Sequence, residues 1–399
     1  MTGPAARTPR IAIVGGGIGG LSAAAFLARA GLPSTVYEQS RELTEVGAGL
    51  VVAPNAARLV RRLGIMAAFT SRAVRLDVGW EFRRWQDGTV LSAEDLASSC
   101  ERRYGEQTYT VHRADLLDVI ALAIPEGTVR LGRRCTELKT NFDRPALLFD
   151  NGDVAQADVV IGADGIHSVV RGALGWSTPA VFSGLSAFRA LVPVDQAPAL
   201  ARRRAQTLWI GPDHHLVHYP VSSGTLVNLV AFAPAGEYAV ESWTATATVD
   251  EFLDEFQGWD PRLADLIRAG GTPGRWALLD RAPLPRWSRD RVTLLGDAAH
   301  PMFPFFAQGA AQAIEDAAVL ARCIAENATD PVTALRRYEA LRIPRTSRLQ
   351  QVSHARARIN HLPDGPEQRA RDQALGSADP LTASAWIYGY DPDAALSAG

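Results

Sequence analysis

Lysine is almost absent from this chain of 399 residues. Lys139 is the single example, although lysine and arginine together number 41. Arginine therefore carries nearly all of the positive charge, and 43 acidic residues balance it to a formal net charge of −2. The basic residues are scattered and form no basic stripe, so the sequence lacks the electrostatic footprint of a nucleic-acid-binding protein. We expect no DNA or RNA partner.

Cysteine is scarce as well. Cys100, Cys135 and Cys323 are odd in number and far apart, and none belongs to a CxxC pair or to a spacing typical of metal ligands. We expect three free thiols and no metal site.

The chain also lacks a long hydrophobic run. Its first ten residues, MTGPAARTPR, are followed by IAIVGGGIGG, a short apolar strand that glycines interrupt. Neither a secretory signal nor a membrane helix has this pattern. We therefore expect a cytoplasmic protein without a membrane partner.

A glycine-rich turn follows this first strand. Gly15, Gly17 and Gly20 form a GxGxxG pattern between the strand at 11–14 and the helical segment LSAAAFLARAG. Glycine permits the tight turn and the close approach of the backbone to a pyrophosphate. The next strand ends in Glu38, which is placed to accept a hydrogen bond from an adenosine ribose. The order of these features predicts a bound FAD or NAD and argues against NADP.

Two further motifs lie far along the chain. GADGIHSVVR at 162–171 contains Asp164, and GDAAHPMFP at 296–304 contains Asp297. Together with the glycine motif, they resemble the signatures of the single-component flavin monooxygenases, the p-hydroxybenzoate hydroxylase-like group. The resemblance covers nearly the whole chain in motif order. It implies FAD as the cofactor, with Asp297 on the flavin ribityl chain and Asp164 in a motif associated with both FAD and the nicotinamide.

The same resemblance implies further contacts with FAD. Arg113, in the segment TVHRADLLDVI, corresponds to an arginine on the diphosphate side, and the backbone at Cys135 lies where relatives contact adenine. Gly309 and Ala310 open a helix whose N-terminus would face the pyrimidine ring and stabilise negative charge there. By spacing alone, Arg113 would instead form a surface ion pair with an aspartate of its own helix.

A histidine and a tyrosine share one face of a predicted strand. In DHHLVHYPV, strand alternation points His215 and Tyr219 to one side, and His214 and His218 to the other. The pattern resembles that of 3-hydroxybenzoate 6-hydroxylase and, more loosely, 6-hydroxynicotinate 3-monooxygenase, in which these residues border the substrate. A histidine with a pKa of about 6.5 is suited to accept a ring-hydroxyl proton near neutral pH. The alternative is an ordinary polar residue in a half-buried strand.

Four more residues are candidates for the substrate pocket. Arg189 would bind a carboxylate through paired hydrogen bonds. Tyr104 and Tyr109, ahead of the HRADL segment, would line the pocket unless they serve only in packing. Phe305 stands where relatives acting on hydroxybenzoate often have glutamine and those acting on hydroxynicotinate have histidine. This apolar wall predicts an altered ring substituent or a different binding angle.

The fold expected from these patterns is mixed α/β, with a Rossmann-like FAD-binding domain. Alternating segments at 76–85, 185–194, 206–221 and 225–234 predict strands of a mixed sheet that forms an inserted substrate domain. We assign 1–75, 105–180 and 290–345 to the FAD domain, and 76–104 and 181–289 to the substrate domain. A long helix beginning near Pro331 and a C-terminal part at 346–399, ending as a surface helix and extended tail, complete the chain.

The resemblance implies an FAD-dependent monooxygenase. NADH or NADPH, bound transiently, would reduce FAD, and O2 would then give a flavin C4a-hydroperoxide that hydroxylates a small, electron-rich aromatic acid. Candidate substrates are a hydroxybenzoate, an aminohydroxybenzoate, salicylate or a hydroxynicotinate. The lysine and the WxWxIP segment of flavin halogenases are not found. Two alternatives stay open: oxidation of a larger polycyclic natural product, and a flavin-dependent reductase that does not activate O2. The protein would be a monomer or a homodimer.

Overall fold

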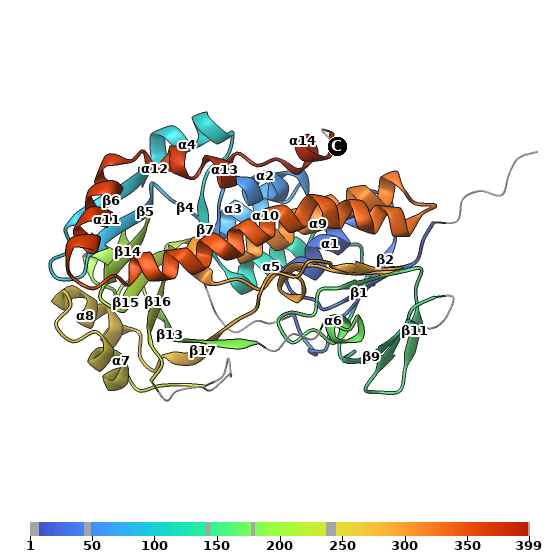
Figure 1. Cartoon of the computed structure of the whole chain (residues 1–399), viewed down its shortest axis with the longest axis horizontal. Coiled ribbons are helices and arrows are strands. Elements are labelled where there is room, and N and C mark those ends of the chain that lie inside the picture. The colour runs from blue at the N-terminus through green and yellow to red at the C-terminus, as the bar shows by residue number, and fades with distance from the viewer. Residues whose placement is uncertain (1–7, 44–48, 141–143, 177–179, 237–244, 398–399) are drawn as a thin grey trace, which may run out of the picture.

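Two large sheets lie toward opposite ends of an elongated molecule in the computed structural model (Figure 1). The structure describes residues 8–43, 49–140, 144–176, 180–236 and 245–397. Residues 1–7, which belong to the N-terminal stretch considered above, lie outside the described residues.

The first sheet has six strands and follows the glycine motif. Its order is β18 (Ser288–Arg289), β19 (Val292–Leu294), β12 (Val159–Gly162), β1 (Ile11–Val14), β2 (Ser34–Tyr37) and β8 (Val129–Arg130). All of these neighbours are parallel except β18 and β19. Every residue of β1 is buried, which explains its continuous apolar sequence. Helix α1 (Ile18–Arg29) leads from β1 back to β2.

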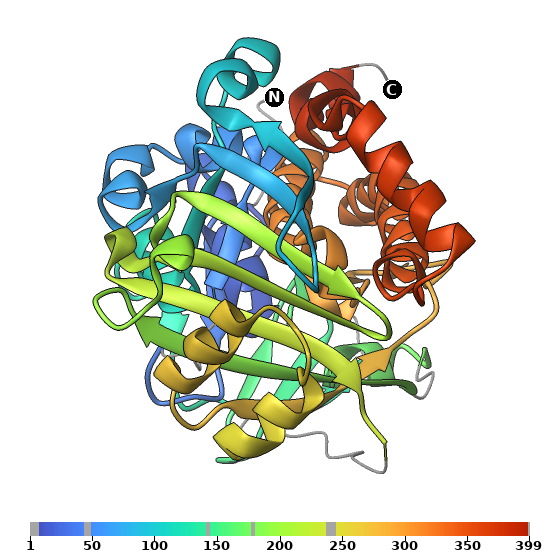
Figure 2. The same ribbon diagram turned by 90° about the vertical axis from the view of Figure 1, so that its left-hand side faces the viewer.

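The second sheet has seven strands and includes the segments predicted from alternation. Its order is β17 (Gly274–Asp280), β13 (Val181–Pro193), β16 (Leu226–Pro234), β15 (His214–Val221), β14 (Ala205–Gly211), β5 (Val78–Arg84) and β6 (Val90–Asp95). β14 and β5 are parallel and the other neighbours are antiparallel, so the sheet is mixed as expected. Figure 2 looks onto this sheet.

One predicted strand is in fact a hairpin. Residues 206–221 fold as β14 and β15, and the turn between them passes through Pro212 and Asp213. Asp213 has a φ of 58°, the left-handed conformation that aspartate tolerates better than most residues. The proline and aspartate are ordinary turn residues, so the sequence carried a signal for this break.

The seven-stranded sheet separates two apolar clusters. Leu216, Trp209 and Phe188 pack under α7 (Val249–Glu255) and α8 (Pro261–Ala269) on one face. Val217 and Tyr219 belong to the cluster on the other face. The alternation predicted for β15 is therefore present.

Smaller elements connect the two sheets. The minor sheets are formed by β3 (Gly49–Val52), β7 (Tyr109–His112) and β4 (Val74–Arg75), and by β11 (Val154–Gln156), β10 (Ala146–Phe149) and β9 (Cys135–Lys139). The remaining helices before residue 300 are α2 (Pro54–Arg62), α3 (Met66–Arg72), α4 (Leu96–Tyr104), α5 (Arg113–Ala121) and α6 (Val169–Ala173). Helix α5 begins at Arg113, as the HRADL segment predicted.

Two long helices complete the scaffold. Helix α9 (Gly309–Glu326) packs against α1, and α10 (Pro331–Asn360) extends along the molecule (Figure 1). Asp330 caps α10 by accepting the N–H of Thr333, so this helix begins where the sequence placed it. These elements confirm the predicted mixed α/β class.

The C-terminal part differs from the expected surface helix and extended tail. It forms four further helices, α11 (Pro366–Ser377), α12 (Pro380–Ala383), α13 (Ala385–Tyr388) and α14 (Pro392–Ser397). Leu381, Ile387 and Tyr388 are buried in a cluster with Leu76 and Leu96. The apolar residues among the prolines and aspartates cover an underlying face, which composition alone did not reveal.

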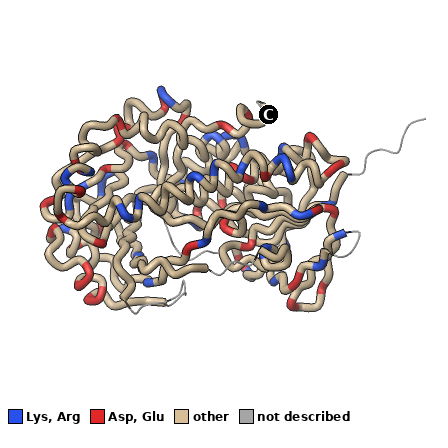
Figure 3. The backbone as a smooth tube through the Cα atoms, viewed as in Figure 1, with Lys and Arg blue, Asp and Glu red and all other residues tan. Residues whose placement is uncertain are grey.

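Basic and acidic residues are interspersed along the backbone (Figure 3). Within the described ranges, no helix combines the length and the apolar character needed to cross a bilayer. The division into FAD domain, substrate domain and C-terminal part stays an interpretation of the two sheets.

Candidate active site

The three sequence motifs meet at one edge of the six-stranded sheet. Because β1, β12 and β19 are parallel, their carboxyl ends lie side by side, and each is followed by one motif. The Ala163 N–H donates to the Val14 carbonyl at 2.8 Å, and the Leu295 N–H donates to the Gly162 carbonyl at 2.9 Å. Ligands of such sheets bind at this edge.

The glycine motif forms a close-packed cradle. Gly15 has a φ of 104°, and a Cβ there would lie 2.3 Å from the Ala163 carbonyl oxygen. A Cβ on Gly20 would lie 1.9 Å from the Gly15 carbonyl oxygen. Gly17 precedes α1 without any side-chain cap, so a phosphate can approach the N–H groups of its first turn.

Glu38 supports this cradle directly. One of its carboxylate oxygens accepts the Gly16 N–H at 2.6 Å, and the other accepts the Ser40 N–H at 2.8 Å. Each oxygen retains a further lone pair. Glu38 therefore both shapes the loop and presents acceptors for a ribose hydroxyl.

Asp164 and Arg171 hold the second motif against the third. Asp164 accepts the Ser168 hydroxyl at 2.5 Å and the Val170 N–H at 3.1 Å, and burial raises its pKa. Arg171 donates to the Ala298 carbonyl at 3.0 Å. Burial, and then the charge of Arg281, lower the pKa of Arg171 to about 10.

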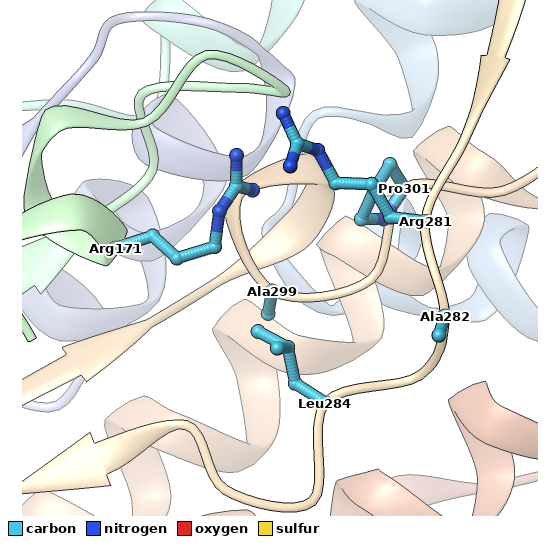
Figure 4. Close-up of a pocket in the computed structure, with 6 residues that line it drawn as sticks. All are labelled: Arg171, Arg281, Ala282, Leu284, Ala299 and Pro301. Atoms are coloured by element: carbon cyan, nitrogen blue, oxygen red, sulfur yellow. The ribbon is translucent and has the colours of Figure 1, made fainter. Parts of the chain in front are cut away.

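Figure 4 shows the guanidinium groups of Arg171 and Arg281 approaching each other beside Ala299 and Pro301. The second motif thus contributes the basic side chain of Arg171 as well as a backbone turn, whereas Arg281 follows β17. Cys135 lies in β9, which packs against α6 at the end of the second motif. Burial, and then the Asp164 carboxylate, raise the pKa of its thiol to about 11.

A buried ion network anchors the third motif. Asp316 accepts the Gly296 N–H at 3.0 Å, and its carboxylate lies 2.5 Å from His300 Nε2. Arg342 of α10 donates to the other Asp316 oxygen at 2.7 Å. Burial opposes the charge, but His300 and Arg342 hold the pKa of Asp316 at about 2.

The same network reaches the start of α9. Glu315 accepts from Arg342 and from Arg345, each at 2.7 Å, and it also accepts the Asn55 amide at 2.7 Å. Asn55 donates at 2.9 Å to Gln308, which precedes α9 and makes no side-chain cap to it.

The residues at the three motifs and at the start of α9 fit a bound FAD. The N–H groups at Gly309 and Ala310 begin α9, and η3 (Gly296–Ala298), which contains the exposed Asp297, packs against this helix. Burial lowers the pKa of Arg113, while the charge of Asp297 acts in the opposite direction. The two aspartates of its own helix, Asp115 and Asp118, instead accept from the Ser222 hydroxyl at 3.0 Å and from Arg72 at 2.8 Å.

The face of the seven-stranded sheet opposite α7 and α8 holds the predicted catalytic pair. His215 is 1% exposed and packs against the Phe232 and Phe305 rings, whose centroids are 4.5 and 5.1 Å from its own. Its Nδ1 lies 2.6 Å from Nε2 of His361. Burial, and then His361, lower the His215 pKa well below its usual value.

Tyr219 and Arg189 lie on the same face as His215. Val217 pairs with Val230, which pairs with Arg189, and directly paired residues of antiparallel strands point to one side. The Arg189 guanidinium stacks 4.6 Å from the Trp276 ring. Burial raises the pKa of Tyr219 to about 12, and Arg189 acts against that rise.

Arg189 carries a buried donor. Among the described residues, its Nε has no hydrogen-bond acceptor. Burial lowers the Arg189 pKa to about 10, whereas Tyr219 raises it and Arg113 lowers it further. Phe303 of the third motif packs into the cluster on this face of the sheet, so Arg189 lies on the side that faces the cofactor motifs.

Tyr104 and Tyr109 make their contacts away from His215, Tyr219 and Arg189. The Tyr104 hydroxyl donates to the Leu381 carbonyl at 2.5 Å, and its ring packs on Tyr388. Tyr109 packs edge-on against Phe69 in the core of the other sheet. These contacts fit the packing alternative for both tyrosines, and their role in lining the pocket stays a prediction.

Several side chains at the site had no sequence signal. His361 and Trp276 approach the face from the end of α10 and from β17. Arg356 of α10 stacks on Phe82 and Phe306, with distances of 5.5 and 5.0 Å to the ring centroids. None is near the motifs in sequence, so only the tertiary fold identifies them.

A dinucleotide cradle beside a buried face with histidine, tyrosine and arginine defines a flavoenzyme that acts on aromatic rings. The chain matches the FAD binding domain family model over residues 8–353, and it belongs to that family. It is an FAD-dependent aromatic-ring monooxygenase, with NAD(P)H as the co-substrate of its class.

Individual relatives cover almost the whole chain. A 3-amino-4-hydroxybenzoate 2-monooxygenase of Streptomyces platensis, PtmB3, is 44% identical over 391 residues, 98% of each chain. A 3-hydroxybenzoate 6-hydroxylase of Aquipseudomonas alcaligenes is 36% identical over 384 residues, 94% of this chain and 96% of the relative. The solved structure of Klebsiella pneumoniae HpxO with FAD and uric acid is 29% identical, covers 97% of each chain and has a TM-score of 0.83.

Proposed function

We propose that the protein hydroxylates an aminohydroxybenzoate, with 3-amino-4-hydroxybenzoate as the first candidate. The observation that carries this proposal is Arg189, a cation whose buried Nε has no acceptor among the described residues and which shares a sheet face with His215. A benzoate presents a carboxylate at one end of its ring and a phenol at the other. The carboxylate can pair with the Arg189 guanidinium, and the phenol can pair with the His215 imidazole.

In this arrangement, Arg189 binds the carboxylate and Tyr219 lies beside it. A charged hydrogen bond of this kind contributes roughly 1.5–3 kcal/mol. His215 accepts the phenolic proton at its other end, which raises the electron density of the ring. Phe232 and Phe305 pack on His215 and on each other, which helps to exclude water from this base.

FAD, when bound and reduced by NAD(P)H, supplies the activated oxygen for the electron-rich ring. The residues that would hold it are Gly15, Gly17, Gly20, Glu38, Arg113, Cys135, Asp164, Asp297, Gly309 and Ala310. A cytoplasmic location and O2 as the second co-substrate are part of the same proposal. Assembly as a monomer or a homodimer stays a prediction.

A substrate panel tests the proposal. Purified holoenzyme is given 3-amino-4-hydroxybenzoate, 3-hydroxybenzoate, salicylate or 6-hydroxynicotinate, while NADH or NADPH oxidation, O2 uptake and product mass are followed. We expect the aminohydroxybenzoate to stimulate coupled O2 uptake most and to yield a product one oxygen heavier.

Other outcomes point to the alternatives. NAD(P)H oxidation with no oxygen in the product would indicate a reductase. No stimulation by any small acid, in protein that holds FAD, would overturn the assignment in favour of a larger natural product.

A further inference from the structure

The His215–His361 contact joins two parts of the chain that are 146 residues apart. His361 follows α10, and its N–H donates to the Ala357 carbonyl at 3.3 Å. Its own carbonyl accepts the N–H of Asp213, in the turn before β15, at 3.1 Å. The backbone of His361 is thus held by both α10 and the β14–β15 turn, so its ring is presented to His215 by two rigid elements.

A separation of 2.6 Å between two ring nitrogens requires one proton between them. Burial lowers the pKa of both rings, that of His361 to about 4, so both are neutral near pH 7. Two neutral tautomers satisfy the contact. Only when His215 donates from Nδ1 is its Nε2 unprotonated and able to accept a proton.

We propose that His361 is a positioning residue that fixes this tautomer of His215 and takes over its proton during the reaction. This inference rests on the proposed function, because it requires a substrate with an acidic ring hydroxyl.

The substrate O–H bond breaks and an N–H bond forms at His215 Nε2. The Nδ1–H bond of His215 then breaks as an N–H bond forms at His361 Nε2, and the Nδ1 proton of His361 passes to water. The products are a substrate phenolate, two neutral histidines and one proton in solvent.

The difference in burial between the two rings gives the proton transfer a direction, from His215 to His361. His215 is 1% exposed and is flanked by aromatic rings, whereas His361 is only partly buried. His361 therefore connects a base without access to water with the surface of the protein.

The neighbouring charged and titratable groups do not take the place of His361 in this proton transfer. His214 lowers the pKa of both rings, and its own Nε2 lies 3.1 Å from Glu255 on the opposite side of the sheet. Arg356, the basic residue one turn earlier on α10, stacks on Phe82 and Phe306. Among the described residues, His361 is the one that forms a hydrogen bond with the His215 ring.

The test uses a substrate analogue whose ionisation is visible. 4-Hydroxy-3-nitrobenzoate keeps the carboxylate and the phenol, and its phenolate absorbs visible light. The absorbance of this probe bound to FAD-loaded protein is titrated against pH, so no turnover is needed. In the wild type we expect the phenol of the bound probe to ionise at a lower pH than in His361→Phe, by at least about one pH unit, a tenfold change in the ionisation constant.

His361→Gln separates positioning from proton transfer. The glutamine amide oxygen can accept the His215 Nδ1–H but cannot carry the proton onward. We expect it to restore most of the probe ionisation, while kcat for the true substrate stays roughly 10- to 100-fold below the wild type with KM little changed. His354→Gln is the matched control on the same helix, because His354 bonds Asp280 at 3.0 Å instead.

Two results overturn the inference in different ways. If all variants hold FAD and the probe ionises alike in wild type and His361→Phe, His361 has no such role although the proposed function stands. If the wild-type holoenzyme does not bind the probe or the aminohydroxybenzoate at all, the proposed function fails and the inference fails with it.

Discussion

At the level of single residues, the site depends on a few polar groups that are buried without an ordinary partner. Arg189 is the clearest case, because its Nε lies in the protein with no acceptor among the described residues, and its charge is stacked on Trp276. A ligand carboxylate would satisfy it.

Replacing Arg189 with methionine should weaken substrate binding. The variant keeps an unbranched apolar side chain but loses the guanidinium and its charged hydrogen bonds, so KM should rise about 10- to 100-fold with a smaller change in kcat. Substrate titration of the flavin fluorescence and steady-state kinetics measure both quantities. Arg268→Met, on the exposed surface of α8, should leave them unchanged. Equal affinity in the Arg189 variant would contradict the carboxylate assignment.

Gly20→Ala should reduce FAD binding. The new Cβ would lie 1.9 Å from the Gly15 carbonyl oxygen, so the phosphate-binding turn must move. Overpacking of this kind costs roughly 1–3 kcal/mol, which corresponds to about 5- to 150-fold in FAD affinity. Reconstitution of apoprotein with FAD, followed by fluorescence, measures the loss. Gly376→Ala in α11, where a Cβ meets only ordinary contacts, is the control.

The elements are linked by buried acidic groups of two kinds. In α9, Asp316 is charged and bound by His300 and Arg342. In β6, Glu94 has only neutral partners, the hydroxyls of Ser384 and Tyr388 at 2.8 and 3.1 Å. The Asp316 carboxylate should therefore stay ionised, whereas the Glu94 carboxyl group should titrate near neutral pH.

Asp316→Asn should destabilise the protein strongly. The amide keeps the size of the side chain but leaves the buried Arg342 guanidinium without one of its two carboxylates, so we expect a loss of about 3–5 kcal/mol in the free energy of unfolding. Urea denaturation measures it. Arg322→Met, which removes exposed ion pairs to Glu326 and Asp393, should change stability by less than about 1 kcal/mol. Comparable losses in both variants would contradict this view of the network.

Glu94 should make stability fall as pH rises. Burial raises its pKa to about 7, so between about pH 4.5 and 7 the folded protein holds a proton that the unfolded chain has released. The free energy of unfolding should therefore decrease by roughly 2–4 kcal/mol across that window and change little above it. Denaturation of wild type and Glu94→Gln at several pH values isolates this contribution as their difference. A difference that does not vary with pH would rule it out.

For the whole molecule, the three thiols give a direct test of the fold. Cys100, Cys135 and Cys323 are buried, and burial raises the pKa of each to about 11. Because the thiolate is the reactive form, the native protein should react slowly with a disulfide reagent, and all three thiols should react after denaturation. Rapid reaction of a thiol in native holoenzyme would show that the packing around it is looser than described.

Much of this architecture could be predicted from the sequence because the evidence was local. The GxGxxG turn, the start of α5 at Arg113 and the shared face of His215 and Tyr219 follow from spacing within a few residues. His361 could not be found this way, because its contact with His215 depends on where a helix of 30 residues ends. The hydrogen bond of Tyr104 could not be predicted for a similar reason, since the carbonyl that accepts from its hydroxyl lies 277 residues later.

The bond from Arg171 to the Ala298 carbonyl spans 127 residues, and β1 and β19 flank β12 in one sheet. The three motifs that form the FAD site can therefore come together only after the ribosome has synthesised the chain at least as far as α9. FAD should stabilise the finished polypeptide rather than guide early folding of the nascent one, because contacts of such long sequence separation form late. Products of premature termination before residue 292 would then lack β19 and compete poorly for the cell's flavin.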